Sequence, residues 1–304
     1  MRTPRCAVLP EGRSAVLEDA VRAGGGEVVP PAEADAVVWF DAKDPNALRE
    51  VLDRHPGIRW VQLPFAGIEP FVDVLDDDRQ WTCGKGVYAE PVAEHALMLG
   101  LAGLRGGARY ARETSWSGPY GHNLLHGHVT IVGGGEITRV LVRLLRPFGA
   151  YLTVVRNHPE PIDGVAEVLP SARLREAVHG ADLVVLALAL TPETEGIVDA
   201  EVLGAMEPHA WLVNVARGRH VDTDALVEAL RAGTIGGAAL DVTDPEPLPE
   251  GHPLWTLPNV LITPHVGNTP EMGLALLAGR IRENVQRFAT GQELLGPVYV
   301  DLGY

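Results

Sequence analysis

The stretch Val129-Thr130-Ile131-Val132-Gly133-Gly134-Gly135-Glu136-Ile137-Thr138 decides the fold. It predicts a buried strand that passes through a glycine turn into a helix over residues 139–148. Such a turn lets backbone N–H groups and a helix N-terminus meet a pyrophosphate, with Gly133 making the tight bend and Gly135 allowing close approach. Thr138 stands where a third glycine is usual, a position that governs helix packing more than phosphate binding. By itself the pattern is equally compatible with a bare structural turn.

The rest of the chain repeats this alternation of short apolar runs and helical patterns. Runs that are apolar on both faces and separated by helices indicate parallel strands, so the expected fold class is α/β with doubly wound parallel sheets. The expected strands are residues 7–9, 36–40, 60–63, 129–132, 152–155, 183–188, 211–215, 238–242 and 260–263. The expected helices include residues 14–23, 46–53, 91–112, 139–148 and 270–290, and the short tail that contains Val298-Tyr299-Val300 should pack back on one of the domains.

Length and composition exclude several classes of protein. The 304 residues suggest two domains, and 40 acidic against 25 basic residues give a net charge of −15. This balance argues against nucleic acid or an anionic membrane as a partner, because both need a dense Lys/Arg face. The most apolar window, residues 96–104, is far shorter than the ~20 residues of a membrane span, and no secretory signal is expected. Two distant cysteines, Cys6 and Cys83, fit a reducing cytoplasm.

The segment Arg156-Asn157-His158 bears on the choice of cofactor. It lies about 20 residues beyond the glycine turn, where an acidic residue would bind the ribose 2′-hydroxyl of NAD and repel a 2′-phosphate. The chain has no carboxylate here, and the planar cation of Arg156 suits a phosphate. We therefore predict an NAD(P) cofactor, with NADP(H) preferred over NAD(H). The alternative is a solvated arginine at a strand end.

Three polar side chains follow three later strands of the predicted sheet: Arg217, Glu246 and His265. The carboxyl ends of parallel strands meet at the edge where ligands bind. A guanidinium can grip a carboxylate and polarise a carbonyl, and a histidine can give a proton to the carbonyl oxygen. A glutamate beside that histidine favours the imidazolium. Taken singly, these residues could instead be a solvated arginine, a surface turn and a buried histidine.

Six motifs together indicate a known family. They are Gly86-Val87-Tyr88-Ala89-Glu90-Pro91-Val92-Ala93-Glu94-His95, the stretch 127–135, Leu190-Thr191-Pro192-Glu193-Thr194, Asn214-Val215-Ala216-Arg217-Gly218, the stretch 241–247 and the stretch 258–265. With this combination the chain resembles the D-isomer-specific 2-hydroxyacid dehydrogenases over nearly its whole length. That family includes D-lactate and D-phosphoglycerate dehydrogenases and glyoxylate/hydroxypyruvate reductases.

The resemblance implies a Rossmann cofactor domain inserted into a flavodoxin-like substrate domain that both chain ends form. We place the substrate-binding domain at residues 1–96 plus 285–304 and the dinucleotide-binding domain at residues 97–284. It also implies that Arg217 binds the substrate, with His265 as the acid/base and Glu246 as its partner. Backbone amides of Ala66, Gly67 and Ile68 would hold the substrate carboxylate. The candidate cofactor-binding residues are Gly133, Gly135, Glu136, Ile137, Arg156, Asn157, Thr194, Val215, Ala216, Asp241, His265 and Gly267.

The expected function is hydride transfer between NAD(P)H and a small 2-oxo or D-2-hydroxy acid, glyoxylate- or hydroxypyruvate-like, by a cytoplasmic homodimer. One alternative is a phosphoglycerate dehydrogenase, although no second basic cluster is evident for a substrate phosphate. Another is a nicotinamide-sensing, non-catalytic protein similar to the related corepressors. A formate dehydrogenase is disfavoured because those enzymes carry glutamine where Glu246 stands. No metal is expected, since His122, His126 and His128 have no carboxylate or cysteine at ligand spacing.

Overall fold

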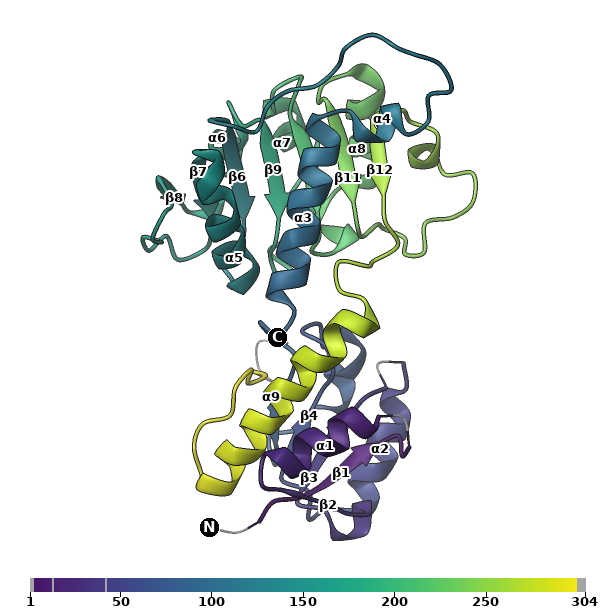
Figure 1. Cartoon of the computed structure of the whole chain (residues 1–304), viewed down its shortest axis with the longest axis vertical. Coiled ribbons are helices and arrows are strands. Elements are labelled where there is room, and N and C mark those ends of the chain that lie inside the picture. The colour runs from purple at the N-terminus through teal and green to yellow at the C-terminus, as the bar shows by residue number, and fades with distance from the viewer. Residues whose placement is uncertain (1–2, 13, 42, 300–304) are drawn as a thin grey trace. The chain divides into compact units, whose positions relative to one another are not determined.

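The computed structural model describes residues 3–12, 14–41 and 43–299, and the chain divides into two compact units (Figure 1). Unit 1 comprises Met1–Tyr88 together with Thr269–Tyr304, and unit 2 comprises Ala89–Asn268. Each unit has its own parallel sheet with helices on both faces, which confirms the α/β class and the doubly wound architecture expected from the sequence. Unit 2 is thus one continuous insertion into unit 1.

Unit 2 contains a seven-stranded sheet in the order β12-β11-β10-β9-β6-β7-β8, and every neighbouring pair is parallel. This is the Rossmann order with one further strand, and the winding reverses between β6 and β9. Ligands of such sheets bind beyond the carboxyl ends of the strands, at this reversal. The strands are β6 (His128–Val132), β7 (Tyr151–Val155), β8 (Glu167–Leu169), β9 (Leu183–Leu186), β10 (Trp211–Asn214), β11 (Gly237–Leu240) and β12 (Val260–Ile262).

Helices cover both faces of this sheet because its strands bury alternate residues on each side. One face carries α3 (Ala89–Leu104), which α4 (Gly107–Tyr110) follows, and α5 (Glu136–Leu145). The other face carries α6 (Leu174–Val178), α7 (Ala200–Ala205) and α8 (Thr223–Ala232). Glycines bring α3 close to the sheet: a Cβ at Gly103 would stand 2.3 Å from Cε3 of Trp211, and one at Gly100 would stand 2.8 Å from Cδ2 of Leu183. These contacts place the C-terminal half of α3 at the amino ends of β9 and β10.

Unit 1 contains a five-stranded parallel sheet in the order β2-β1-β3-β4-β5, which is the flavodoxin-like order. Helices α1 (Ala15–Ala23) and α9 (Pro270–Thr290) bury apolar residues on one face, and α2 (Pro45–Arg54) does so on the other. The strands are β1 (Arg5–Leu9), β2 (Glu27–Val28), β3 (Ala36–Trp39), β4 (Trp60–Gln62) and β5 (Gln80–Thr82).

The unit boundaries differ from those expected from the sequence. The expected boundaries after residues 96 and 284 fall inside helices, whereas the structure assigns all of α3 to unit 2 and all of α9 to unit 1. The helix α9 belongs to unit 1 because Leu277, Ile281 and Val285 lie in the same buried cluster as Leu17 and Val21 of α1. A boundary within either helix would divide one buried apolar face between two cores.

The chain after α9 returns to the sheet of unit 1. The N–H of Val298 donates to the carbonyl oxygen of Trp81 at 2.9 Å, and the N–H of Cys83 donates to that of Gly296 at 2.8 Å. The tail therefore packs back as expected, although Val300 and the rest of 300–304, like residues 1 and 2, lie outside the described residues. In the described ranges no helix combines the length and apolarity needed to cross a bilayer.

Candidate active site

The glycine turn after β6 has the geometry that a phosphate-binding turn requires. Gly133 has φ of +117°, and a Cβ there would stand 2.1 Å from the carbonyl oxygen of Ala187, so only glycine fits. Gly135 directly precedes the first turn of α5, and a Cβ there would meet no described atom within 4 Å. The helix N-terminus thus borders open space, as the binding of a pyrophosphate requires.

Thr138, at the position of the usual third glycine, ties the helix to the turn. Its side chain is fully buried, and Oγ1 donates a 2.8 Å hydrogen bond to the carbonyl oxygen of Gly133. The hydroxyl satisfies a buried acceptor, so a threonine is accommodated between helix and strand. Of the two other residues predicted to bind cofactor in this turn, Ile137 packs on the core, whereas Glu136 is half-exposed and ion-paired with Arg139 at 2.7 Å.

Arg156 follows β7 and lies against the glycine turn. A Cβ at Gly134 would stand 2.8 Å from Cδ and 2.9 Å from Nε of Arg156. Within the described part of the chain, no hydrogen bond or ion pair engages the Arg156 guanidinium. Its neighbour Asn157 instead accepts a 2.6 Å hydrogen bond from the Ser171 hydroxyl. The turn therefore has a cation beside it that is available to a ligand.

The loop after β10 holds Arg217 through buried polar groups. The Asn214 side chain accepts from the N–H of Ala216 at 3.0 Å and donates to the carbonyl oxygen of Arg217 at 2.8 Å. Beneath it lies the buried ring of His220, with Nδ1 3.2 Å from the backbone nitrogen of Arg217 and Nε2 3.2 Å from the carbonyl oxygen of Ala189. These contacts fix the backbone from which the guanidinium extends.

The loop after β9, which carries Thr194, is joined to the loop of Arg217. The Thr194 hydroxyl donates to the carbonyl oxygen of Ala189 at 2.8 Å, the same oxygen that the His220 ring approaches. The N–H of Val198 donates to the carbonyl oxygen of His220 at 2.9 Å. Two further residues predicted to bind cofactor, Val215 and Ala216, are buried in this region.

Gly218 brings the loop after β10 into contact with the loop after β11. A Cβ at Gly218 would stand 2.0 Å from the carbonyl carbon and oxygen of Thr243, so no other residue fits. The Thr243 hydroxyl donates to the carbonyl oxygen of Pro245 at 2.9 Å, and the Thr223 hydroxyl donates to that of Asp244 at 3.0 Å. The segment that carries Glu246 is thereby held against the segment that carries Arg217.

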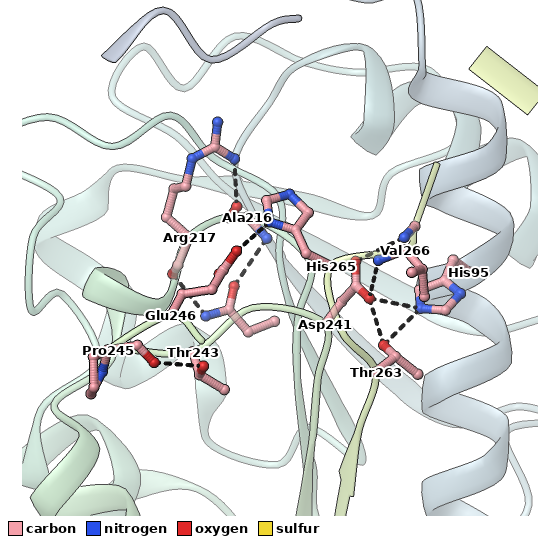
Figure 2. A network of polar contacts seen from close by, with 12 residues as sticks. His95, Ala216, Arg217, Asp241, Thr243, Pro245, Glu246, Thr263, His265 and Val266 are labelled. Carbon is pink, nitrogen blue, oxygen red and sulfur yellow. Dashed lines mark hydrogen bonds and ion pairs between the residues drawn. The ribbon is translucent and has the colours of Figure 1, made fainter. Parts of the chain in front are cut away.

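His265 and Glu246 form a short hydrogen-bonded pair (Figure 2), with 2.6 Å between Nδ1 and Oε1. The two side chains are 51% and 41% exposed. Because Nδ1 faces the carboxylate, Nε2 of the exposed ring is left to another partner. His265 also has φ of +55°, a left-handed conformation that is uncommon for a residue with a side chain. Arg217, Glu246 and His265 therefore gather beyond the carboxyl ends of three adjacent strands, β10, β11 and β12.

Asp241, at the end of β11, binds the loop that carries His265. Its carboxylate accepts hydrogen bonds from the N–H of Val266 and of Gly267, both at 2.9 Å. Burial alone would raise the pKa of Asp241, but hydrogen bonds from His95, Thr263 and these two N–H groups lower it to about 2. Asp241 and Gly267, both predicted to bind cofactor, thus contact each other.

The loop Ala66-Gly67-Ile68, expected to hold a substrate carboxylate, belongs to unit 1. Ala66 is exposed, whereas the Ile68 side chain is buried and anchors the loop. Within residues 3–12, 14–41 and 43–299, the N–H groups of these three residues donate to no backbone or side-chain acceptor. They are therefore available to a carboxylate.

Sequence reasoning gave no role to His95 and Asn214, although both orient loops of the site. The signal that could have found them is a polar side chain next to an apolar helical run or at a strand end. The predicted histidine cluster divides: His122 stacks on His209 and His128 on Tyr151, with ring centroids 5.1 Å apart in each pair. Over the described residues, no three His, Cys, Asp or Glu side chains are arranged to hold a metal.

This arrangement defines a nicotinamide-dependent dehydrogenase as a class, and comparison with known proteins identifies the family. The family model "D-isomer specific 2-hydroxyacid dehydrogenase, NAD binding domain" matches residues 95–267. The chain belongs to the D-isomer-specific 2-hydroxyacid dehydrogenase family, as its motifs indicated. It is accordingly an NAD(P)-dependent oxidoreductase that acts on 2-oxo and 2-hydroxy acids.

The chain is also similar to individual proteins over most of its length. An "Uncharacterized protein in proB 3'region" of Corynebacterium melassecola is 39% identical over 302 residues, 97% of each chain. The glyoxylate/hydroxypyruvate reductase A of Serratia proteamaculans (strain 568) is 32% identical over 221 residues, which cover 71% of this chain and 69% of the relative. A solved D-isomer specific 2-hydroxyacid dehydrogenase from Xanthobacter autotrophicus Py2, in complex with NADPH and MES, superposes over all of both chains with a TM-score of 0.85 and 28% identity.

Proposed function

We propose that this protein reduces a small 2-oxo acid of the glyoxylate or hydroxypyruvate type to its D-2-hydroxy acid, with NADPH as the reductant. The observation that carries this proposal is the 2.6 Å contact between Nδ1 of His265 and Oε1 of Glu246 beside the Arg217 loop. It leaves Nε2 of an exposed imidazole as a proton donor, oriented by a carboxylate.

Each residue then has one task. When bound, the reduced nicotinamide supplies the hydride for the carbonyl carbon. The Arg217 guanidinium binds the substrate carboxylate and polarises its carbonyl. The N–H groups of Ala66, Gly67 and Ile68, which have no acceptor among the described residues, are further candidate donors to a carboxylate. Nε2 of His265 gives its proton to the carbonyl oxygen, and Glu246 holds the ring in this orientation through its hydrogen bond with Nδ1. The half-exposed His265 ring regains a proton from water.

The preference for NADPH rests on Arg156. Its guanidinium has no partner in the described chain and lies beside Gly134, at the end of the strand where an acidic residue would select NAD. A planar cation there can form charge-assisted hydrogen bonds with a 2′-phosphate. The NADPH complex of the relative from Xanthobacter autotrophicus supports the same preference. Gly133, Gly135, Glu136, Ile137, Asn157, Thr194, Val215, Ala216, Asp241, His265 and Gly267 complete the proposed cofactor contacts.

The preference for a small substrate rests on the groups around the acid/base pair. Glu246, rather than glutamine, argues against formate. We identify no second basic cluster that would bind a substrate phosphate, which argues against phosphoglycerate. The printed name of the relative from Serratia proteamaculans, glyoxylate/hydroxypyruvate reductase A, agrees with this proposal.

A spectrophotometric assay tests the proposal. The protein is mixed with NADPH or NADH and a panel of 2-oxo acids, and loss of reduced-nicotinamide absorbance is followed. We expect turnover of glyoxylate or hydroxypyruvate, with a higher kcat/KM for NADPH than for NADH. The Arg156→Leu variant should lose about 10- to 150-fold in affinity for NADPH, the worth of a hydrogen bond to a charged group, and little for NADH. Arg175→Leu, a change at an exposed side chain of α6, is the matched control.

Two results would contradict the proposal. Tight NADPH binding without turnover of any acid would indicate a nicotinamide sensor rather than an enzyme. Equal use of NADH and NADPH by the wild-type protein would remove the role given to Arg156.

We also propose a homodimer in a reducing cytoplasm. The segment between α4 and β6 loops away from the sheet of unit 2 (Figure 1), and it exposes Trp116 completely and Leu125 by 56%. Exposed apolar side chains on one segment favour burial against a second copy. Light scattering should give a mass in solution of twice the 32.6 kDa of one chain. The Trp116→Glu substitution should lower the measured mass toward that of a single chain. Both described cysteines are buried and free, which suits a reducing compartment.

A further inference from the structure

His95 lies near the start of α3, the helix that Gly100 and Gly103 bring onto the sheet. Those glycines contact the amino ends of β9 and β10, so the earlier turns of the same helix reach the carboxyl ends of the strands. The His95 side chain is 15% exposed, and its Cδ2 lies 3.7 Å from where a Cβ of Gly267 would stand. The ring thus packs on the backbone of the loop that carries His265.

A chain of hydrogen bonds leads from His95 to that loop (Figure 2). Nε2 of His95 is 3.0 Å from Oγ1 of Thr263 and 3.2 Å from Oδ1 of Asp241. The Thr263 hydroxyl donates its single proton to Oδ1 of Asp241 at 2.5 Å. In the contact with His95, the Thr263 oxygen can therefore only accept a hydrogen bond. The Nε2–H tautomer of His95 supplies the donor, and the orientation of Thr263 toward Asp241 depends on it.

The loop that this chain holds has an unfavourable backbone at His265. Its φ of +55° puts a non-glycine residue in the left-handed region, which costs of the order of 1–2 kcal/mol. Two hydrogen bonds oppose that cost, because the N–H of His265 donates to the carbonyl oxygen of Asp241 at 2.8 Å and to that of Thr263 at 3.0 Å. The Asp241 carboxylate also accepts hydrogen bonds from the N–H groups of Val266 and Gly267, the two residues that follow His265.

We propose that His95 is a positioning residue that, through Thr263 and Asp241, keeps the loop of His265 in the conformation that presents the His265–Glu246 pair. This inference rests on the proposed function in that His265 is the proton donor there. A histidine that merely fills space at this place would be replaceable by another ring of similar size. A positioning histidine is replaceable only by a side chain that can donate.

Two substitutions separate these possibilities. His95→Phe keeps a ring but removes the donor, whereas His95→Gln keeps an N–H donor at a similar distance. We expect His95→Phe to lower kcat about 10- to 100-fold, the effect of a misplaced reacting group, and to leave KM for NADPH within about threefold. His95→Gln should retain kcat within about threefold of the wild type. Wild-type kcat in His95→Phe would overturn the proposal.

A measurement without cofactor or substrate gives a second reading. Hydrogen–deuterium exchange of the Val266 and Gly267 amides should accelerate about tenfold in His95→Phe and stay unchanged in His95→Gln, because Asp241 then holds them less firmly. His179→Phe, at an exposed site, is the control. If the wild-type protein proves inactive on every acid, the proposed function fails, but this exchange result still supports or overturns the positioning role.

The Thr263→Val variant tests the same proposal if a His95 variant fails to fold. It removes the hydroxyl between His95 and Asp241 and keeps the volume of the side chain. We expect the same acceleration of exchange at Val266 and Gly267 and the same fall in kcat. Unchanged exchange and unchanged kcat in Thr263→Val would overturn the proposal.

Discussion

His265 combines an exposed imidazole with a constrained backbone. Its ring is 51% exposed and can reach a ligand, while its φ of +55° and its contact with Glu246 fix the direction of Nε2. A flexible exposed histidine would lose conformational entropy at each encounter with a substrate. The cost of the left-handed conformation is met within the protein, so the proton donor is oriented before a substrate arrives.

Replacing His265 tests its role as proton donor. His265→Asn should lower kcat by about 10² to 10⁴, the usual contribution of a positioned acid or base. Asparagine tolerates the left-handed backbone, so the loop should keep its conformation. NADPH binding, followed by quenching of protein fluorescence, should be unchanged. Full activity in this variant would exclude His265 as the acid.

Asp241 should stabilise the folded protein at neutral pH. Its pKa falls from the ordinary 3.8 to about 2, so the folded state binds its proton less readily than the unfolded state. The corresponding stability, about 2 kcal/mol from the size of the shift, is present above pH 3.8 and is lost as the pH falls toward 2. Urea unfolding of the wild type and of Asp241→Asn should therefore differ by a constant amount between pH 5 and pH 8. A difference that changes within that range would implicate another titrating group.

At the scale of elements, the packing of α3 depends on its glycines. Gly103→Ala would place a Cβ 2.3 Å from the Trp211 ring, and overpacking of this kind costs about 1–3 kcal/mol. Gly279→Ala is the matched control, because Gly279 lies within α9 and a Cβ there meets no described atom within 4 Å. That change should stabilise the protein by about 0.5–1 kcal/mol through helix propensity. Equal effects of the two substitutions on urea unfolding would contradict close packing of α3.

The central strands and the edge strand β12 were predictable from sequence, whereas the short edge strands β2, β5 and β8 were not. Strands such as β6 and β9 have neighbours on both sides and both faces buried, so they appear as continuous apolar runs. The strands β2, β5 and β8 have two or three residues, begin with a polar side chain and lie at sheet edges. An edge strand has a neighbour on one side only and needs fewer apolar residues. In strands of two or three residues, the apolar pattern is too short to recognise.

The candidate site shows the same division. Arg217, Glu246 and His265 were proposed from the sequence because each follows a recognisable strand and supplies a group that the proposed chemistry needs. His95 was not found, because a polar residue beside an apolar helical run does not show which loop the helix approaches. That depends on how closely α3 packs on the sheet. The domain boundaries were misplaced for a related reason: the core to which a helix belongs is decided by long-range packing.

At the scale of the whole molecule, the residues proposed to bind ligands belong to two units that each have a separate core. Each unit buries apolar clusters of its own, and the proposed cofactor contacts all lie in unit 2. The proposed carboxylate-binding loop, by contrast, lies in unit 1. A net charge of −15 repels an anionic substrate at long range, so the proposed binding relies on local donors such as Arg217.

Hydrogen–deuterium exchange at short times should resolve this division. NADPH alone should protect amides around Gly133 and Arg156 in unit 2, because a ligand that binds only the folded form suppresses local opening. Oxalate, a dicarboxylate without a reducible carbonyl, should add protection at Ala66, Gly67 and Ile68, whose N–H groups have no acceptor in the described chain. Chloride at equal ionic strength should not, since the effect requires an anion with carboxylate geometry. Unchanged exchange at these three amides in the presence of oxalate would contradict carboxylate binding by this loop.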